Sequence, residues 1–303
     1  MEKTIDKTRI KLKLTNFKGV VMKKRKIKKY CKNYSKYFKN NNFDKALNAC
    51  KKIPDNTLNT LGLVKKGICY SEIGKYSQAI RCFKQAIRLN NRSVNAYFNL
   101  GITYSKLRFH KKAIDNFTKV LYFKPDCAKA YCYRGSHYID LKKYSKAISD
   151  FTIAIELNPY YIEAYGNRSA AYIKSKEFEK AIDDCTKLNS LDNNTGYHNR
   201  GIAYALLQQY ENAILDFSKV IELKPKDFYA YMFRGNVFSN IKQYEQAIKD
   251  YNKAIELAPS ESIGIIYKAR GEVYKNLAET EKAQLDFENA KKYHNKKCKI
   301  IKL

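Results

Sequence analysis

Arginine and aspartate residues recur along this chain at a fixed separation, and they are the first candidates for chemistry. In five copies an Asp follows an Arg by 16 residues. Paired carboxylates and guanidinium groups could bind ligands or move protons, but an active site is normally unique. Five copies therefore favour structural ion pairs between neighbouring helices, with a row of ligand-binding arginines as the alternative. The pairs are Arg134 with Asp150, Arg168 with Asp184, Arg200 with Asp216, Arg234 with Asp250, and Arg270 with Asp286.

Histidine and cysteine, the usual zinc ligands, show no metal-binding spacing. No two cysteines form a C-x-x-C pair, and the histidines lie far from any cysteine cluster. The histidines also share no predicted helix face and no recurring carboxylate partner. We therefore expect no metal and no cofactor. The residues are Cys31, Cys50, Cys69, Cys82, Cys127, Cys132, Cys185 and Cys298, and His110, His137, His198 and His294.

The opening sequence, MEKTIDKTRIKLKL, has no apolar core of the kind that a signal peptide needs. The cysteines are accordingly expected to be free thiols in a reducing compartment, and the protein to be cytoplasmic. No apolar run approaches the ~18–20 residues that a membrane span requires.

The formal charge of +30 is concentrated at the two ends of the chain. Residues 1–60 carry 18 Lys and Arg against four acidic residues, and residues 291–303 carry six Lys and no acid. The middle of the chain is only mildly basic. The run KKRKIKK, Lys23 to Lys29, could be a nuclear import signal or a patch for nucleic acid or an anionic membrane surface. It could equally be a solvated charge run, since Lys, Asn, Ile and Tyr are over-used throughout.

The elements that position these residues follow from a repeat of about 34 residues. A small residue recurs at spacings of 34, 34, 34, 32, 34 and 36, with an aromatic three residues later and an Ala twelve residues later. A second ring follows that Ala by four residues in six copies, and a Pro closes four units. The small residues are Gly67, Gly101, Gly135, Ser169, Gly201, Gly235 and Gly271, and the prolines are Pro125, Pro159, Pro225 and Pro259.

Each unit is predicted to be two helices. In residues 128–161 the apolar positions follow a helical period from about Ala128 to Leu141 and again from about Tyr144 to Leu157. The small residue lies where the two helices would cross closely. Pro159 ends the second helix, because its ring cannot continue the hydrogen-bond ladder.

This pattern resembles the tetratricopeptide repeat (TPR) family, with Leu or Tyr where that family has Trp. Seven units cover residues 60–297, and residues 30–59 resemble a degenerate further unit through Phe43, Ala46 and Cys50. The resemblance implies an all-α fold, a right-handed superhelical α-solenoid of antiparallel helix pairs. Residues 1–29 are expected to be a disordered basic tail. Residues 291–303 are expected to extend or cap the array, and 298–303 form the basic end of that segment.

The resemblance also implies a concave groove built from the first helix of each unit. An apolar strip flanked by Asn side chains suits an extended or helical peptide, and paired amide groups could hold its backbone. A groove Asn could also merely be solvated, and His198 is the one histidine expected on this wall. The predicted groove residues are Asn95, Phe98, Asn99, Ile102, Lys129, Cys132, Asn167, Ala170, His198, Asn199, Ile202, Tyr229, Met232 and Asn236.

One subtype of the family grips the carboxylate tail of heat-shock chaperones, and its pattern is incomplete here. Asn167, within NRSAAY, matches, but Cys132 and Thr195 stand where that clamp needs Lys. Binding of a chaperone tail by that mechanism is not expected. The predicted function is a non-catalytic scaffold or adaptor that binds a peptide or partner protein. The alternative is association with nucleic acid or an anionic surface through the basic N-terminal tail.

Overall fold

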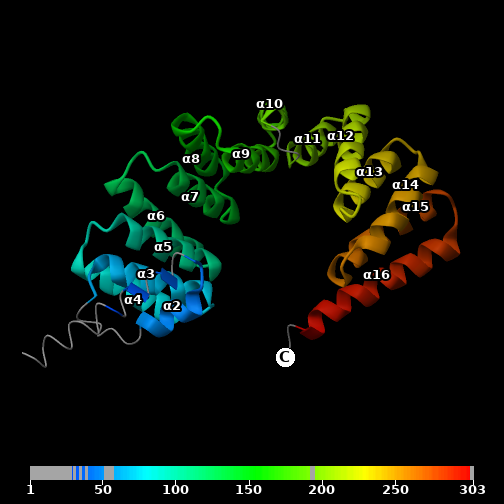
Figure 1. Ribbon diagram of the computed structural model, residues 1–303. Coiled ribbons are helices and arrows are strands. Elements are labelled where there is room, and N and C mark those ends of the chain that lie inside the picture. The colour runs from blue at the N-terminus through cyan, green and yellow to red at the C-terminus, as the bar shows by residue number, and fades with distance from the viewer. Residues whose placement is uncertain are drawn as a thin grey trace, which may run out of the picture. The chain divides into compact units, whose positions relative to one another are not determined.

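The described part of the chain is helical throughout its regular elements (Figure 1). The computed structural model describes residues 29, 32–33, 36–37, 40–50, 58–191 and 195–300, with the side chains of 294–300 excepted. The predicted all-α solenoid of helix pairs is confirmed. The predicted tail lies outside the described residues apart from Lys29, and so do residues 301–303. The chain divides into two compact units, Met1–Leu141 and Lys142–Leu303.

In the first unit, helices that follow one another along the chain pack together, and α3 also packs on α5. Leu63, Phe83 and Phe117 are fully buried in its core. Helix α2 coincides with the second helix of the predicted degenerate unit and buries Ala46 and Cys50. Whether residues 30–59 form a complete repeat stays a prediction. The helices are α2 (Phe43–Cys50), α3 (Thr60–Glu72), α4 (Tyr76–Leu89), α5 (Val94–Lys106), α6 (His110–Phe123) and α7 (Ala128–Asp140).

In the second unit each helix again packs on the next, and α9, α11, α13 and α15 also contact one another in that order. The first helices therefore form one continuous layer, as a repeat array requires. Counting both units, four second helices end two residues before the prolines at 125, 159, 225 and 259. The helices are α8 (Tyr144–Leu157), α9 (Ile162–Ser175), α10 (Phe178–Ser190), α11 (Thr195–Leu206), α12 (Tyr210–Leu223), α13 (Phe228–Asn240), α14 (Tyr244–Leu257), α15 (Ser260–Asn276) and α16 (Thr280–Ile300).

The glycine of a repeat makes room for the aromatic ring that follows the recurring Ala by four residues, and not for that Ala alone. A Cβ built on Gly201 would lie 2.9 Å from a ring carbon of Phe217, closer than real Cβ contacts allow. Phe217 is fully buried against α11. The same relation joins Gly101 to Phe117. The periodic small residue and the periodic ring are therefore two halves of one contact.

The turn between the two helices of a repeat places one residue in the left-handed backbone region. Its φ is 56° at Arg108, 66° at Lys176 and 60° at Ala278. Among the turns that the structure describes, the one at Gly74, with φ 76°, has the residue that accepts this conformation without strain. The turn ends the first helix and redirects the chain into the second, between the two helices predicted for residues 128–161.

Candidate peptide-binding groove

An open groove of about 630 Å³ lies in the second unit. Its walls come from the first helices α9, α11 and α13, together with the C-terminal end of α12 and the turn that follows it. Ile162, Ala170 and Val220 supply apolar surface, while Glu163, Lys224 and Asp227 supply charge. Five predicted groove residues line it, namely Asn167, Ala170, His198, Asn199 and Tyr229.

His198 is held in this groove by aromatic rings. Its ring lies edge-on to Phe233 at 5.4 Å between centroids and to Phe217 at 6.1 Å. Burial lowers the pKa of His198; Asp227 opposes this shift and Lys224 reinforces it. The side chain is therefore neutral at neutral pH, with a hydrogen-bond donor and an acceptor for a ligand.

The groove asparagines are less available than the sequence suggests. The amide nitrogen of Asn199 donates to Ser169 Oγ at 2.9 Å and to the Gly166 carbonyl at 3.3 Å. In the first unit Asn99 donates to the carbonyl of Asn95, one turn earlier, at 2.8 Å. These bonds tie the side chains to the array's own helices. Asn199 can therefore offer a peptide its carbonyl oxygen, whereas Asn99 keeps its carbonyl oxygen and one amide hydrogen.

Two predicted groove residues are buried, which corrects their predicted place on the groove wall. Cys132 is 5% exposed and Met232 is 8% exposed, because both pack into the layer between helices rather than onto the wall. Asn236 accepts a hydrogen bond from the Tyr251 hydroxyl at 2.8 Å, so it too contacts its own array. Ile202, like Met232 and Asn236, lies outside the lining of the 630 Å³ groove.

The predicted groove residues of the first unit lie on α5 and α7. Asn95 and Lys129 are exposed, while Phe98 and Ile102 are partly buried. Phe98 packs edge-on against Phe117, with 5.7 Å between the ring centroids. The described surface of α5 therefore offers an aromatic edge beside polar side chains.

The recurring arginines are partly buried beside aromatic rings and bond to groups of the array itself. Arg168 Nε donates to Asp184 Oδ2 at 2.8 Å and Nη2 to Oδ1 at 2.7 Å. Its third nitrogen, Nη1, donates to Thr152 Oγ1 on the preceding second helix at 2.9 Å. The rings of Tyr165 and Tyr172 each lie 5.8 Å from the guanidinium carbon. The bidentate contact recurs in Arg200 with Asp216, Arg234 with Asp250, and Arg270 with Asp286.

Arg134 makes the equivalent contact to the preceding second helix, where Nη1 donates to Thr118 Oγ1 at 3.2 Å. Its guanidinium lies 5.5 Å from the centre of the Tyr131 ring. Asp150 is 4% exposed. The carboxylates of the other four copies are buried to a similar extent, from 3% to 7% exposed.

The described thiols show no activated nucleophile. Cys127 and Cys185 are free thiols, and Cys185 beside Asp184 is fully buried. Burial raises the pKa of Cys185 to about 12, so it is protonated at neutral pH and unreactive.

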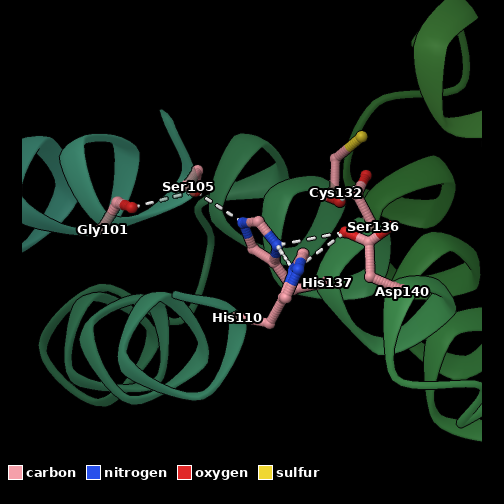
Figure 2. Close-up of polar contacts among 7 residues, drawn as sticks. All are labelled: Gly101, Ser105, His110, Cys132, Ser136, His137 and Asp140. Carbon is pink, nitrogen blue, oxygen red and sulfur yellow. Dashed lines mark hydrogen bonds and ion pairs between the residues drawn. The ribbon is translucent and has the colours of Figure 1, made fainter. Parts of the chain in front are cut away.

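A second polar cluster, which the sequence analysis missed, lies in the first unit. His110, His137 and Asp140 bring their ligand atoms within 4.8 Å of one another (Figure 2). Burial lowers the pKa of His137 and His110 lowers it further, while Asp140 opposes the shift. His110 and His137 share no helix face, as predicted, but they contact each other and Asp140 across two helices. His110 begins α6, and His137 lies 27 residues later on the neighbouring helix α7, so periodicity along one helix could not join them.

Comparisons with known proteins agree with this architecture. Sequence models described as tetratricopeptide repeats match residues 94–127, 128–161, 162–195, 195–227 and 228–261, and one described as a TPR repeat matches 69–107. No curated protein sequence matches the chain. Within the described residues, no helix combines the length and the apolar character that crossing a membrane would take.

Several solved structures share the fold. A tetratricopeptide repeat protein from Parabacteroides merdae is 20% identical, with a TM-score of 0.64, over 82% of this chain and 99% of that one. The MamA protein is 26% identical, with a TM-score of 0.51, over 55% and 92%. A chain of the APC/C hetero-tetramer Cut9-Hcn1 is 17% identical, with a TM-score of 0.59, over 71% of this chain and 42% of that one. Because the matched repeats span residues 69–261, well over half of the sequence, the chain belongs to the tetratricopeptide repeat family.

Proposed function

We propose that this protein is a non-catalytic interaction scaffold that binds an extended peptide segment of a partner protein in the groove of α9, α11 and α13. Arrays of this family serve in general as protein-interaction scaffolds, and the groove is the feature that carries the proposal here. Its 630 Å³ lie within the ~300–1,000 Å³ of a typical ligand site.

The chemistry of the lining favours a neutral or mildly basic peptide. Glu163 and Asp227 outnumber Lys224 among the charged lining residues. An acidic tail would meet two carboxylates there, which agrees with the expectation that the chaperone-tail clamp is incomplete. Apolar peptide side chains would contact Ala170 and the exposed ring of Tyr229, while His198 and Asn199 bond to the peptide backbone.

Site-specific photo-crosslinking tests where the partner binds. A photoreactive amino acid at Ala170, in the groove, is compared with one at Leu215 on α12, which is 68% exposed and outside the groove lining. An extract of the source cells should yield a defined adduct from position 170 and none from position 215. Equal adduct yields from both positions would exclude the groove as the binding surface.

The peptide identified in that adduct then allows a matched pair of variants. Tyr229→Ala removes a groove ring that is 45% exposed, whereas Tyr122→Ala removes a 76% exposed ring on α6. We expect weaker peptide binding for Tyr229→Ala alone. Affinity should change little with ionic strength, because few charges pair across this groove.

The alternative function through the basic tail predicts the opposite salt dependence. Binding to phosphates should fall steeply, with a log–log slope of about −0.7 to −0.9 per contact. It should also be lost on deletion of residues 1–29. Cytoplasmic location, and nuclear import through Lys23 to Lys29, stay predictions.

A further inference from the structure

Three ligand atoms in the first unit are arranged as the face of a tetrahedral metal site. His110 Nδ1 lies 3.2 Å from His137 Nδ1 and 3.1 Å from Asp140 Oδ2, and His137 Nδ1 lies 3.5 Å from Asp140 Oδ2. An ion with ligand bonds of about 2.0–2.1 Å in tetrahedral geometry needs donors about 3.3–3.4 Å apart. We propose that His110, His137 and Asp140 form a binding site for a divalent transition-metal ion of the zinc type, separate from the peptide groove.

The hydrogen bonds of Ser105 fix the His137 tautomer that a metal requires (Figure 2). Ser105 Oγ donates its only proton to the Gly101 carbonyl at 2.9 Å. His137 Nε2, 2.5 Å from that oxygen, must therefore be the donor of their contact. The neutral ring then carries its proton on Nε2 and presents the lone pair of Nδ1 to His110 and Asp140. Metal-binding histidines are usually oriented in this way, through the nitrogen that does not bind the ion.

The cluster combines a rigid ligand with accessible ones. The His137 side chain is 8% exposed, that of His110 is 27% and that of Asp140 is 50%. An ion can therefore enter from solvent on the Asp140 side, and water or a partner's side chain can occupy the fourth position. His110 is the first residue of α6 and Asp140 the last of α7, so the opposed helix dipoles offset each other. The carboxylate of Asp140 thus provides the net negative charge.

The donor set selects the class of ion. Two imidazoles and one carboxylate suit Zn²⁺, Co²⁺, Ni²⁺ or Cu²⁺, whereas Mg²⁺ and Ca²⁺ require mostly oxygen ligands. Binding would join α6 to α7 and thereby stabilise the contact between successive repeats of this unit. Without metal, a proton on His110 Nδ1 lies between His137 and Asp140. When the metal binds, it takes this position, and the proton moves to Nε2 of His110.

The test measures Zn²⁺ affinity of the full, reduced, metal-free chain by competition with a chromogenic chelator. Two variants each remove one ligand, Asp140→Asn and His110→Gln, and His198→Gln removes a histidine from the other unit. We expect Zn²⁺ affinity to fall at least about tenfold in both ligand variants, since even outer-shell changes cost about 10–100-fold. His198→Gln should bind as the unmodified chain does. Circular dichroism without metal checks that each variant folds, and half-exposed Asp140 is the safer substitution.

Cobalt separates this site from the cysteine thiols. Bound Co²⁺ should give the visible absorption of a four- or five-coordinate ion without a thiolate-to-cobalt charge-transfer band, and Asp140→Asn should abolish it. Three results would each overturn the proposal. These are no Zn²⁺ binding at micromolar free ion, unchanged affinity in both ligand variants, or a thiolate band in the cobalt complex.

Discussion

Arg168 and Asp184 form a bidentate ion pair whose two contacts measure 2.8 and 2.7 Å. The pair joins α9 to α10 within one repeat, and the third guanidinium nitrogen reaches Thr152 on α8 in the repeat before. One side chain therefore holds three helices. The Arg side chain is 15% exposed and that of the Asp is 7% exposed, so little water screens the contact.

Breaking this pair from one side should destabilise the array strongly. Asp184→Asn leaves the Arg168 guanidinium buried without its counter-charge, which costs about 3–5 kcal/mol for buried pairs. Chemical denaturation of the full chain measures the loss. Lys180→Gln, which removes an exposed pair with Glu177, is the control and should leave stability nearly unchanged. Equal effects of the two substitutions would contradict a structural role for the recurring Arg and Asp.

A glycine that faces a buried ring should tolerate no larger side chain. In Gly201→Ala the added methyl group would meet the ring of Phe217 at 2.9 Å, so overpacking should cost about 1–3 kcal/mol. Gly166→Ala is the matched control, because its nearest atom, on Leu188, is 3.8 Å away. There the gain in helix propensity, about 1 kcal/mol, should dominate. We expect the denaturation midpoint to fall in Gly201→Ala and to rise in Gly166→Ala, both relative to the unmodified chain.

Periodic features were predictable from the sequence, and features that occur once were not. The pairing seen in Gly201 and Phe217 recurs in six repeats, so repeated copies identify the helix pair and its contact. The trio of His110, His137 and Asp140 occurs once and is assembled from two helices, so no spacing along the chain signals it. The hydrogen bond from the Asn199 amide to Ser169 depends on how side chains of neighbouring repeats are oriented. The sequence does not show this orientation, so the amide was predicted to be available to a peptide.

The left-handed turns offer a test of backbone strain without packing changes. A Cβ on Gly74 would meet no atom within 4 Å, so Gly74→Ala changes only the conformational cost of φ 76°. We expect a loss of about 1 kcal/mol, from the ~1–2 kcal/mol cost of the left-handed region for residues with a Cβ. Ala278→Gly, at φ 60° in the last repeat, should stabilise by a similar or smaller amount. Thermal unfolding of both variants checks the pair, and the same sign for both would exclude strain as the cause.

His198 should make the array less stable in acid. Burial lowers its pKa in the folded state below the ordinary value of about 6.5, so the unfolded chain takes up a proton first as the pH falls. Its contribution is complete above about pH 6.5 and declines below it, until folded His198 is protonated as well. Urea unfolding from neutral pH to about pH 5 should therefore show a smaller loss in His198→Gln than in the unmodified chain. Identical pH profiles would mean that the ring is not desolvated beside Phe217 and Phe233.

The C-terminal end of α16 should stabilise the array, whereas the basic N-terminal tail should not. Helix α16 continues past the length of the other second helices to Ile300, and Tyr293 stacks on Tyr267 of α15 at 5.9 Å with an interplanar angle of 20°. Deleting residues 291–303 removes this stacked ring and exposes the last repeat, so the melting temperature should fall by about 2–4 °C for each kcal/mol lost. Residues 1–29 carry 12 Lys and Arg but few large apolar residues, and their deletion should leave the melting temperature nearly unchanged. Tyr293→Ala separates the ring from the helix and should reproduce part of the C-terminal effect. The reverse order of the two deletions would overturn both assignments, because it would place the stabilising contacts in the N-terminal segment.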